Sequence, residues 1–241
     1  MAKPVARSHR FSERGGGARN GIAMIFDLEG FSRFFNQPDI HEYIPKYLNL
    51  VLQAVDVCIF GGRKFWLPDR PKLDRPDVLP VHRKFLGDGV LYLWTPARGK
   101  EDFSQAFIFA LANRMWNLKN EFAAVNRAAA ETVPVVEVPP RIRFGIARGT
   151  VFELPVEGRP EPEYIGFCVN LASRLQGYCP ALGFLASARL DLPQELLDRH
   201  GYAKVVATKL KGFPKEMLLV DREEYARLSA ATRKNLFQEL P

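Results

Sequence analysis

The chain has 241 residues, of which 47% are hydrophobic and 25% are charged, so it can form one large domain with a full core. Residues 1–20 hold five basic residues against one acidic residue, a charge of +4, which leaves +3 of the total of +7 for the rest of the chain. The composition therefore does not indicate a nucleic-acid-binding protein, which would carry a basic stripe with interleaved aromatic residues on its folded part. We expect the basic tail itself to be disordered.

Cysteine usage and apolar patterning predict a cytoplasmic protein. Cys58, Cys168 and Cys179 show no metal-binding spacing such as Cys-x-x-Cys, which is typical of free thiols in a reducing compartment. No secretory signal is visible, and no run approaches the roughly 18 apolar residues of a membrane-spanning helix. We therefore expect no membrane association.

The first half of the chain is predicted to alternate between strands and helices. A continuous apolar run over 22–27 indicates a buried strand, and apolar residues at three- and four-residue spacings indicate a helix over about 40–59. Residues 61–80 are rich in Pro, Gly and charge, so we interpret them as a loop insertion. Residues 84–94 indicate two short strands joined by a Gly-Asp-Gly turn.

The second half begins with a helix predicted over 103–122. Alternation over 141–154 predicts a hairpin that turns at Arg148–Gly149, and a further helix opens near Gly166. The remainder is predicted to form strands over 184–187, 204–210 and 216–220 and a charged helix that begins near 222. The predicted division is a tail (1–20), one domain (21–221) and a C-terminal helix (222–241).

This order of elements predicts an α+β fold, with one mostly antiparallel sheet and helices packed on one face of it. Such a sheet would bring the end of the first strand next to the turn of the first hairpin. Asp27 ends the first strand and Asp88 occupies the turn, so the two carboxylates would lie side by side. Asp beside Gly is also common in turns for purely conformational reasons, which is the alternative explanation for Asp88.

Two neighbouring carboxylates are suited to hard divalent cations. Mg²⁺ prefers one or two carboxylates together with phosphate oxygens and water. A pair of such ions can hold the attacking and leaving oxygens of a phosphoryl or nucleotidyl transfer. Asp27 and Asp88 therefore suggest this class of reaction without identifying a substrate.

Five motifs in order resemble the class III adenylyl and guanylyl cyclase family over about residues 20–221. They are Phe26-Asp27-Leu28-Glu29-Gly30-Phe31-Ser32, Lys84-Phe85-Leu86-Gly87-Asp88, Arg143-Phe144-Gly145-Ile146-Ala147-Arg148-Gly149, Gly166-Phe167-Cys168-Val169-Asn170-Leu171-Ala172-Ser173-Arg174-Leu175 and Leu210-Lys211-Gly212. The resemblance implies a ferredoxin-like catalytic domain that converts a nucleoside triphosphate to its 3′,5′-cyclic monophosphate and pyrophosphate.

The resemblance also implies a role for the first motif and for Asp88. Asp27, Asp88 and the Leu28 carbonyl would hold two Mg²⁺ or Mn²⁺ ions in each active site. Backbone amides from Glu29 to Ser32, including those of Phe31 and Ser32, would cradle the outer phosphates, consistent with the free N–H groups at the start of a helix.

The later motifs would complete the active site from a second protomer. By resemblance, Asn170 would orient the ribose, Arg174 would stabilise charge on the α-phosphate, and Lys211 would contact the triphosphate. In the family, the metal-binding aspartates lie on one protomer and the Asn-Arg pair on the other. The resemblance therefore implies a homodimer with two equivalent sites.

The expected base-reading residues depart from both purine patterns. In adenylyl cyclases a Lys and an Asp read the base, whereas guanylyl cyclases usually carry Glu and Cys at these positions. This chain has Lys84 with Glu163, a donor and an acceptor that would suit adenine, cytosine or uracil. Bulky Phe85, Tyr164 and Phe167 near these positions could fill the space of a purine, or could be ordinary core residues.

The chain is similar to the stand-alone bacterial pyrimidine cyclases of antiphage signalling, which make cyclic UMP or cyclic CMP to activate a co-encoded effector. This similarity favours UTP over CTP and implies an effector that responds to the cyclic nucleotide rather than to direct binding. The alternatives are an ATP-specific cyclase in which Glu163 replaces Asp, and a cyclase-like domain that binds nucleotide and regulates a partner without turnover.

Overall fold

The structure is a computed structural model that describes residues 10–12, 15–135 and 137–239. The helices are α1 (Phe31–Phe35), α2 (Ile44–Phe60), α3 (Gln105–Ala130), α4 (Phe167–Tyr178), α5 (Gln194–Arg199), α6 (Arg222–Arg227) and α7 (Ala230–Leu236), with short 3₁₀ helices η1 (Ile40–Glu42) and η2 (Ala188–Leu190). The strands are β1 (Arg19–Leu28), β2 (Gly62–Arg63), β3 (Lys72–Leu73), β4 (His82–Phe85), β5 (Gly89–Trp94), β6 (Ile142–Leu154), β7 (Glu163–Gly166), β8 (Phe184–Ser187), β9 (Tyr202–Ala207), β10 (Glu216–Asp221) and β11 (Phe237–Glu239).

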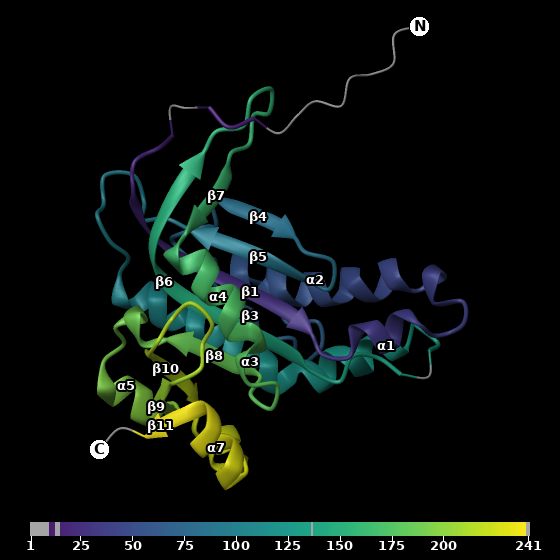
Figure 1. The fold of residues 1–241 in the computed structure, drawn as a ribbon. Coiled ribbons are helices and arrows are strands. Elements are labelled where there is room, and N and C mark those ends of the chain that lie inside the picture. The colour runs from purple at the N-terminus through teal and green to yellow at the C-terminus, as the bar shows by residue number, and fades with distance from the viewer. Residues whose placement is uncertain (1–9, 13–14, 136, 240–241) are drawn as a thin grey trace, which may run out of the picture.

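The described residues form a nine-stranded sheet at the centre of the molecule (Figure 1). Its order is β11-β9-β10-β8-β6-β1-β5-β4, and β7 pairs with the far end of β6. Only β6 and β8 are parallel among its described pairings. The predicted α+β class with a mostly antiparallel sheet is therefore confirmed.

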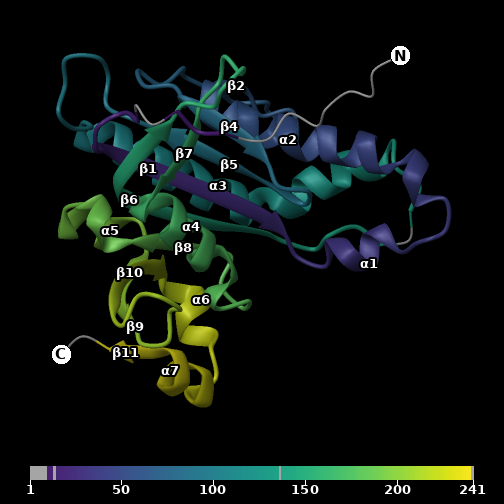
Figure 2. The same cartoon turned by 45° about the horizontal axis from the view of Figure 1, so that its top comes forward.

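Helices cover both faces of this sheet, so the prediction of helices on one face was wrong (Figures 1 and 2). Strand β1 explains the difference. Its residues Ile22, Met24 and Phe26 join the core beneath α2 and α3, whereas Ala23 and Ile25 join the core beneath α4. Strand residues alternate between faces, so a strand that is apolar at every position is buried on both sides.

The predicted hairpin over 141–154 is one long strand. β6 continues through Arg148 and Gly149, and the chain reverses only in the loop between β6 and β7. Gly149 faces Gly21 of β1, and a Cβ built on Gly149 would lie 2.5 Å from Cδ1 of Phe167. This glycine therefore makes room for the Phe167 ring instead of forming a turn.

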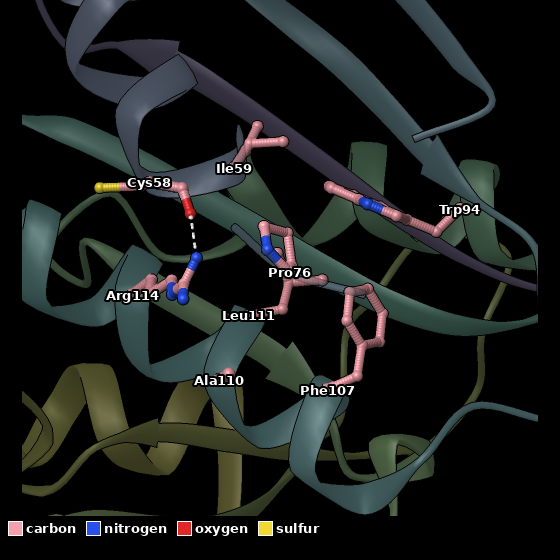
Figure 3. A pocket seen from close by; sticks show the side chains of 8 residues that line it. All are labelled: Cys58, Ile59, Pro76, Trp94, Phe107, Ala110, Leu111 and Arg114. Atoms are coloured by element: carbon pink, nitrogen blue, oxygen red, sulfur yellow. Dashed lines mark hydrogen bonds between the residues drawn. The ribbon is translucent and has the colours of Figure 1, made fainter. Parts of the chain in front are cut away.

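The 61–80 insertion is folded against the two long helices. Strands β2 and β3 pair within it, and Lys64 Nζ lies 2.8 Å from Glu121 Oε1 of α3. Figure 3 shows Pro76 of the insertion between Ile59, Trp94 and Leu111. The space left between these residues is about 10 Å³, roughly the space of a single water, which is too small for a ligand.

The C-terminal helix predicted over 222–241 is divided into α6, α7 and the short strand β11. Leu228 is extended, and the Ser229 side chain accepts a hydrogen bond from the Thr232 amide to begin α7. Strand β11 then pairs with β9 at the edge of the sheet. The predicted single helix is therefore interrupted because Ser229 caps a new helix within the helical sequence pattern.

Part of the expected tail lies against the domain. The Ser12 amide donates to the Pro155 carbonyl oxygen at 2.9 Å, and the Glu157 amide donates to the Arg10 carbonyl oxygen at 2.9 Å. Residues 1–9 and 13–14, on which most of the predicted disorder falls, lie outside the described residues. No helix among the described residues is long and apolar enough to cross a bilayer.

Candidate active site

The two predicted metal-binding aspartates meet where β1 ends and the neighbouring strand β5 begins, in the interior of the sheet. Asp27 pairs in register with Gly89 of β5, so Asp88 in the preceding turn is its neighbour. The Asp27 side chain is only 14% exposed. Burial raises its pKa above the ordinary value, and the nearby Asp88 and Glu29 carboxylates raise it further, whereas Arg143 lowers it. The sheet therefore forces two carboxylates together in a partly dry environment.

Arg143 compensates this concentration of negative charge. It lies directly across β1 from Asp27, and its Nε donates to Asp27 Oδ1 at 3.0 Å while a second guanidinium nitrogen donates to Oδ2. Arg143 belongs to the third cyclase-like motif, but the sequence alone predicts no role for it. Its contact depends on the register between β1 and β6, which a motif alone does not specify.

The donor set fits Mg²⁺ or Mn²⁺ bound together with a substrate. No group of three or more His, Cys, Asp or Glu side chains suited to a metal occurs in the described part of the chain. Two aspartates at neighbouring strand ends are the carboxylate complement that Mg²⁺ uses when substrate phosphates and water supply the remaining oxygens. Leu28, the predicted source of a carbonyl ligand, follows Asp27 as the last residue of β1.

The predicted phosphate cradle is partly formed. Gly30 has φ 76°, which favours glycine, and it caps the short helix α1, where Phe31 and Ser32 are the first residues. The Glu29 amide, by contrast, donates to the Arg141 carbonyl oxygen at 3.0 Å. The expected set of amides is therefore reduced in this structure to those that follow Glu29. A pocket of about 320 Å³ opens beside this loop, lined in part by Glu29, Gly30 and Arg33.

The two residues predicted to read the base, Lys84 and Glu163, also contact each other. Lys84 Nζ of β4 lies 2.7 Å from Glu163 Oε2 of β7, although 79 positions separate the residues. The hydrogen bond from Lys84 holds the pKa of Glu163 below its ordinary value of 4.5, so its carboxylate is ionised at neutral pH. The β6–β7 hairpin therefore delivers an acceptor next to the lysine donor of β4.

Of the three bulky residues expected near this pair, only Tyr164 lies beside it. Cross-strand partners point to the same face of a sheet, so Lys84, opposite Leu91, faces α4. Phe85 is opposite Val90 and points to the other face, where it is exposed. Strand alternation therefore removes Phe85 from the base-reading pair.

Phe167 has a different role at the start of α4. Its ring packs edge-on against Phe213 at 5.3 Å between ring centroids, and the Arg189 guanidinium lies 4.7 Å above it. Phe213 closes the loop that carries the exposed Lys211. Phe167 thereby fastens the Lys211 loop to the first turn of α4.

Asn170 and Arg174 lie on the exposed side of α4, one turn apart. Neither side chain has a hydrogen bond or ion pair within the described residues. They therefore do not bond to Asp27 or Asp88 of the same described chain. Two unpaired polar groups on an exposed helix face remain free to meet a ligand or a second protomer.

Solved structures resemble this fold, although no protein-family model and no curated protein sequence matches the chain. The adenylyl cyclase CyaB from P. aeruginosa has a TM-score of 0.58 at 17% identity, over 85% of this chain and 94% of that one. The guanylyl cyclase Cya2 has a TM-score of 0.56 at 20% identity, over 86% and 93%. A bacterial light-regulated adenylyl cyclase has a TM-score of 0.56 at 13% identity, over 88% and 53%.

At these identities the likeness establishes the fold, which is that of the class III cyclase catalytic domain. The predicted fold class is thus confirmed by two independent comparisons of nearly full-length domains. The roles of the individual site residues remain predictions.

Proposed function

We propose that the protein is a nucleotidyl cyclase that converts UTP to 3′,5′-cyclic UMP and pyrophosphate. The observation that carries this proposal is the convergence of Asp27 with Asp88, and of Lys84 with Glu163, on a fold shared with adenylyl and guanylyl cyclase structures. In this proposal the ribose 3′-oxygen attacks the α-phosphorus and loses its proton. The bond from the α-phosphorus to the bridging oxygen breaks, and pyrophosphate leaves.

The chain's own residues would bind and orient the substrate for this step. Asp27, Asp88 and the Leu28 carbonyl would hold two Mg²⁺ or Mn²⁺ ions, which supply Lewis acidity toward the phosphate oxygens. The amides of Phe31 and Ser32 would bind outer phosphates.

Three polar side chains on α4 and its neighbouring loop would complete the site. Asn170 would orient the ribose, Arg174 would stabilise charge developing on the α-phosphate, and Lys211 would contact the triphosphate. Their exposure on α4 and its neighbouring loop supports a site shared between two protomers of a homodimer.

The choice of UTP rests on the base-reading pair. A lysine donates and a carboxylate accepts, so Lys84 and Glu163 match O4 and N3–H of uracil. The same chemistry suits cytosine or adenine, which makes CTP and ATP the alternative substrates. A uridylate cyclase of this kind would serve as a second-messenger synthase in bacterial antiphage defence, acting on its effector through cyclic UMP.

The test is to incubate purified protein with Mn²⁺ and each of the four ribonucleoside triphosphates separately, and to identify the products by mass spectrometry. We expect cyclic UMP and an equal amount of pyrophosphate from UTP, with loss of both products in EDTA. Cyclic AMP or cyclic CMP as the main product would retain the cyclase assignment and refute the preference for UTP. Nucleotide binding without any product would indicate a regulatory domain instead.

A further inference from the structure

A pair of aromatic rings lies directly beside the base-reading pair. His82 lies two residues before Lys84 on β4, opposite Leu93, so both side chains face α4. The His82 ring lies 5.0 Å from the Tyr164 ring, centroid to centroid, with the planes tilted by 53°. Tyr164 directly follows Glu163 on β7. Strands β4 and β7 thus contribute both the Lys84–Glu163 ion pair and the neighbouring pair of aromatic rings.

The ring pair is held in place from both sides. Tyr164 packs on the core beneath α4, and its hydroxyl lies 3.5 Å from Glu153, its cross-strand partner on β6. His82 is half-buried in strand β4. Burial lowers its pKa below the ordinary value of 6.5, with Glu163 and Glu161 acting to raise it and Lys84 to lower it. At neutral pH the imidazole is uncharged, so it acts on a bound base through its size and hydrogen bonding.

From this arrangement we propose that His82, backed by Tyr164, occupies the space that the second ring of a purine would need, and so restricts the nucleobase site to pyrimidines. This inference rests on the proposed function, because it assumes that Lys84 and Glu163 bind the base. A purine exceeds a pyrimidine by one fused five-membered ring, which is the size of the imidazole that His82 places beside the pair. The residue is thus assigned to substrate specificity, separately from the groups proposed to act on the phosphates.

Three variants in the full chain test this assignment. His82→Ala removes the ring, His82→Phe keeps a ring of similar width, and Arg83→Ala is the matched control. Arg83 is the next residue of β4, but it points to the opposite face toward Asp56 and Tyr92. Initial cyclisation rates with all four triphosphates would be compared for each variant at equal protein concentration.

We expect His82→Ala to raise the ratio of purine to pyrimidine turnover about tenfold or more, since filling or emptying a pocket by a few atoms changes selectivity by that order. His82→Phe and Arg83→Ala should retain the wild-type ratio. An unchanged ratio in a folded His82→Ala protein would overturn the assignment. A wild-type preference for purines would overturn it as well, while leaving the cyclase function intact.

Equilibrium binding of the same four triphosphates with Ca²⁺ provides a readout that does not need turnover. If the wild-type protein makes no product but binds pyrimidine nucleotides, and His82→Ala gains purine binding, the size restriction holds and the proposed catalysis fails. Binding of purines and pyrimidines with equal affinity by the wild-type protein would overturn the size restriction. Absence of binding to all four nucleotides would overturn both proposals.

Discussion

Asp27 and Arg143 form a half-buried ion pair across β1 and β6. Two hydrogen bonds from the guanidinium satisfy Asp27, and the carboxylate of Asp88 stands beside it. Removing one member of this half-buried pair would leave the other charge uncompensated, so a substitution of Asp27 would also disturb the fold. Asp88 has no such partner in the described chain, so its substitution gives a cleaner test of function.

We predict that Asp88→Asn lowers cyclisation by at least about a hundredfold, because the amide removes the charge that a divalent cation requires. Its free energy of unfolding should stay within about 0.5 kcal/mol of wild type, since the side chain makes no hydrogen bond or ion pair within the described residues. Steady-state rates and urea unfolding would measure the two effects. The control is Asp77→Asn, in the exposed insertion, which should change neither quantity.

If Asp88→Asn retained wild-type activity with Mn²⁺, the conformational preference for Asp beside Gly in turns would alone explain why Asp occupies this position. That result would contradict the proposed metal site.

Single site residues could be predicted from the sequence where a motif coincided with the end of a predicted strand. Asp27, Asp88, Lys84 and Glu163 were all expected, and the structure brings them together as two pairs. The contacts of Arg143 and His82 were missed because they depend on the β1–β6 register and on the β6–β7 hairpin reaching β4. Neither of these long-range arrangements has a local sequence signal.

Helix α4 connects the site to the rest of the sheet. Its first residue, Phe167, fits against Gly149 of β6 and against Arg189, whose Nε donates to the buried Glu216 at 2.8 Å. Asn170 follows Phe167 by one turn. Packing at Gly149 is therefore expected to set the position of Asn170.

We predict that Gly149→Ala lowers cyclisation about tenfold and destabilises the protein by about 1–3 kcal/mol, because the new methyl group would force the Phe167 ring to move. Gly17→Ala, which has open space around its Cβ, should change neither quantity. Combining Gly149→Ala with Phe167→Leu should recover part of the stability. A Gly149→Ala enzyme with wild-type rate and stability would refute this role for the packing.

A buried ion pair ties α3 to β10 and α6. Asp221 Oδ2 accepts from Lys119 Nζ at 2.7 Å and from Trp116 Nε1 at 2.6 Å, and Oδ1 caps α6. Burial acts to raise the pKa of Asp221, but the hydrogen bonds from Lys119, the Glu224 amide and Trp116 outweigh it and lower the pKa below 3.8. The ionised form is thus favoured in the folded protein.

We predict that Asp221→Asn destabilises the protein by about 3 kcal/mol at neutral pH, because it leaves Lys119 buried without full compensation. A folded-state pKa below the unfolded value gives stability that is complete above the unfolded pKa and is lost as the pH falls through the folded pKa. The difference between wild type and variant should therefore be constant above about pH 5 and shrink below about pH 4. Urea unfolding at a series of pH values between about 3 and 7 would measure this difference. A difference that does not change with pH would contradict the lowered pKa of Asp221.

At the scale of elements, the sequence predicted the main strands and helices but not their packing. The continuous apolar run of β1 indicated burial on both faces, yet the fold was expected to carry helices on one. The prediction of a hairpin turn at Arg148–Gly149 was wrong. Glycine also occurs where a neighbouring side chain packs closely against the backbone, as the Phe167 ring does at Gly149.

The whole molecule presents its proposed catalytic groups in two separate places. Asp27 and Asp88 lie at the adjoining ends of β1 and β5, whereas Asn170 and Arg174 lie unpaired on α4 within the described residues. Apolar side chains are exposed on the strands and turns beside these groups. They are Phe85, Leu86, Phe152 and Ile165. Exposed apolar groups next to the proposed catalytic residues support the proposed association of two copies of the chain.

The most direct test of a cyclase site assembled between two protomers is complementation between inactive variants. Asp88→Asn and Arg174→Ala proteins would be tagged differently, mixed, and shown to form mixed dimers by two-step affinity purification. Cyclic nucleotide production would then be compared with each variant alone and with the Asp88→Asn/Arg174→Ala double variant.

Equal mixing should restore about a quarter of the wild-type activity, because half of the dimers are mixed and each of these has one intact site. Mixed dimers that make no product would contradict the shared site.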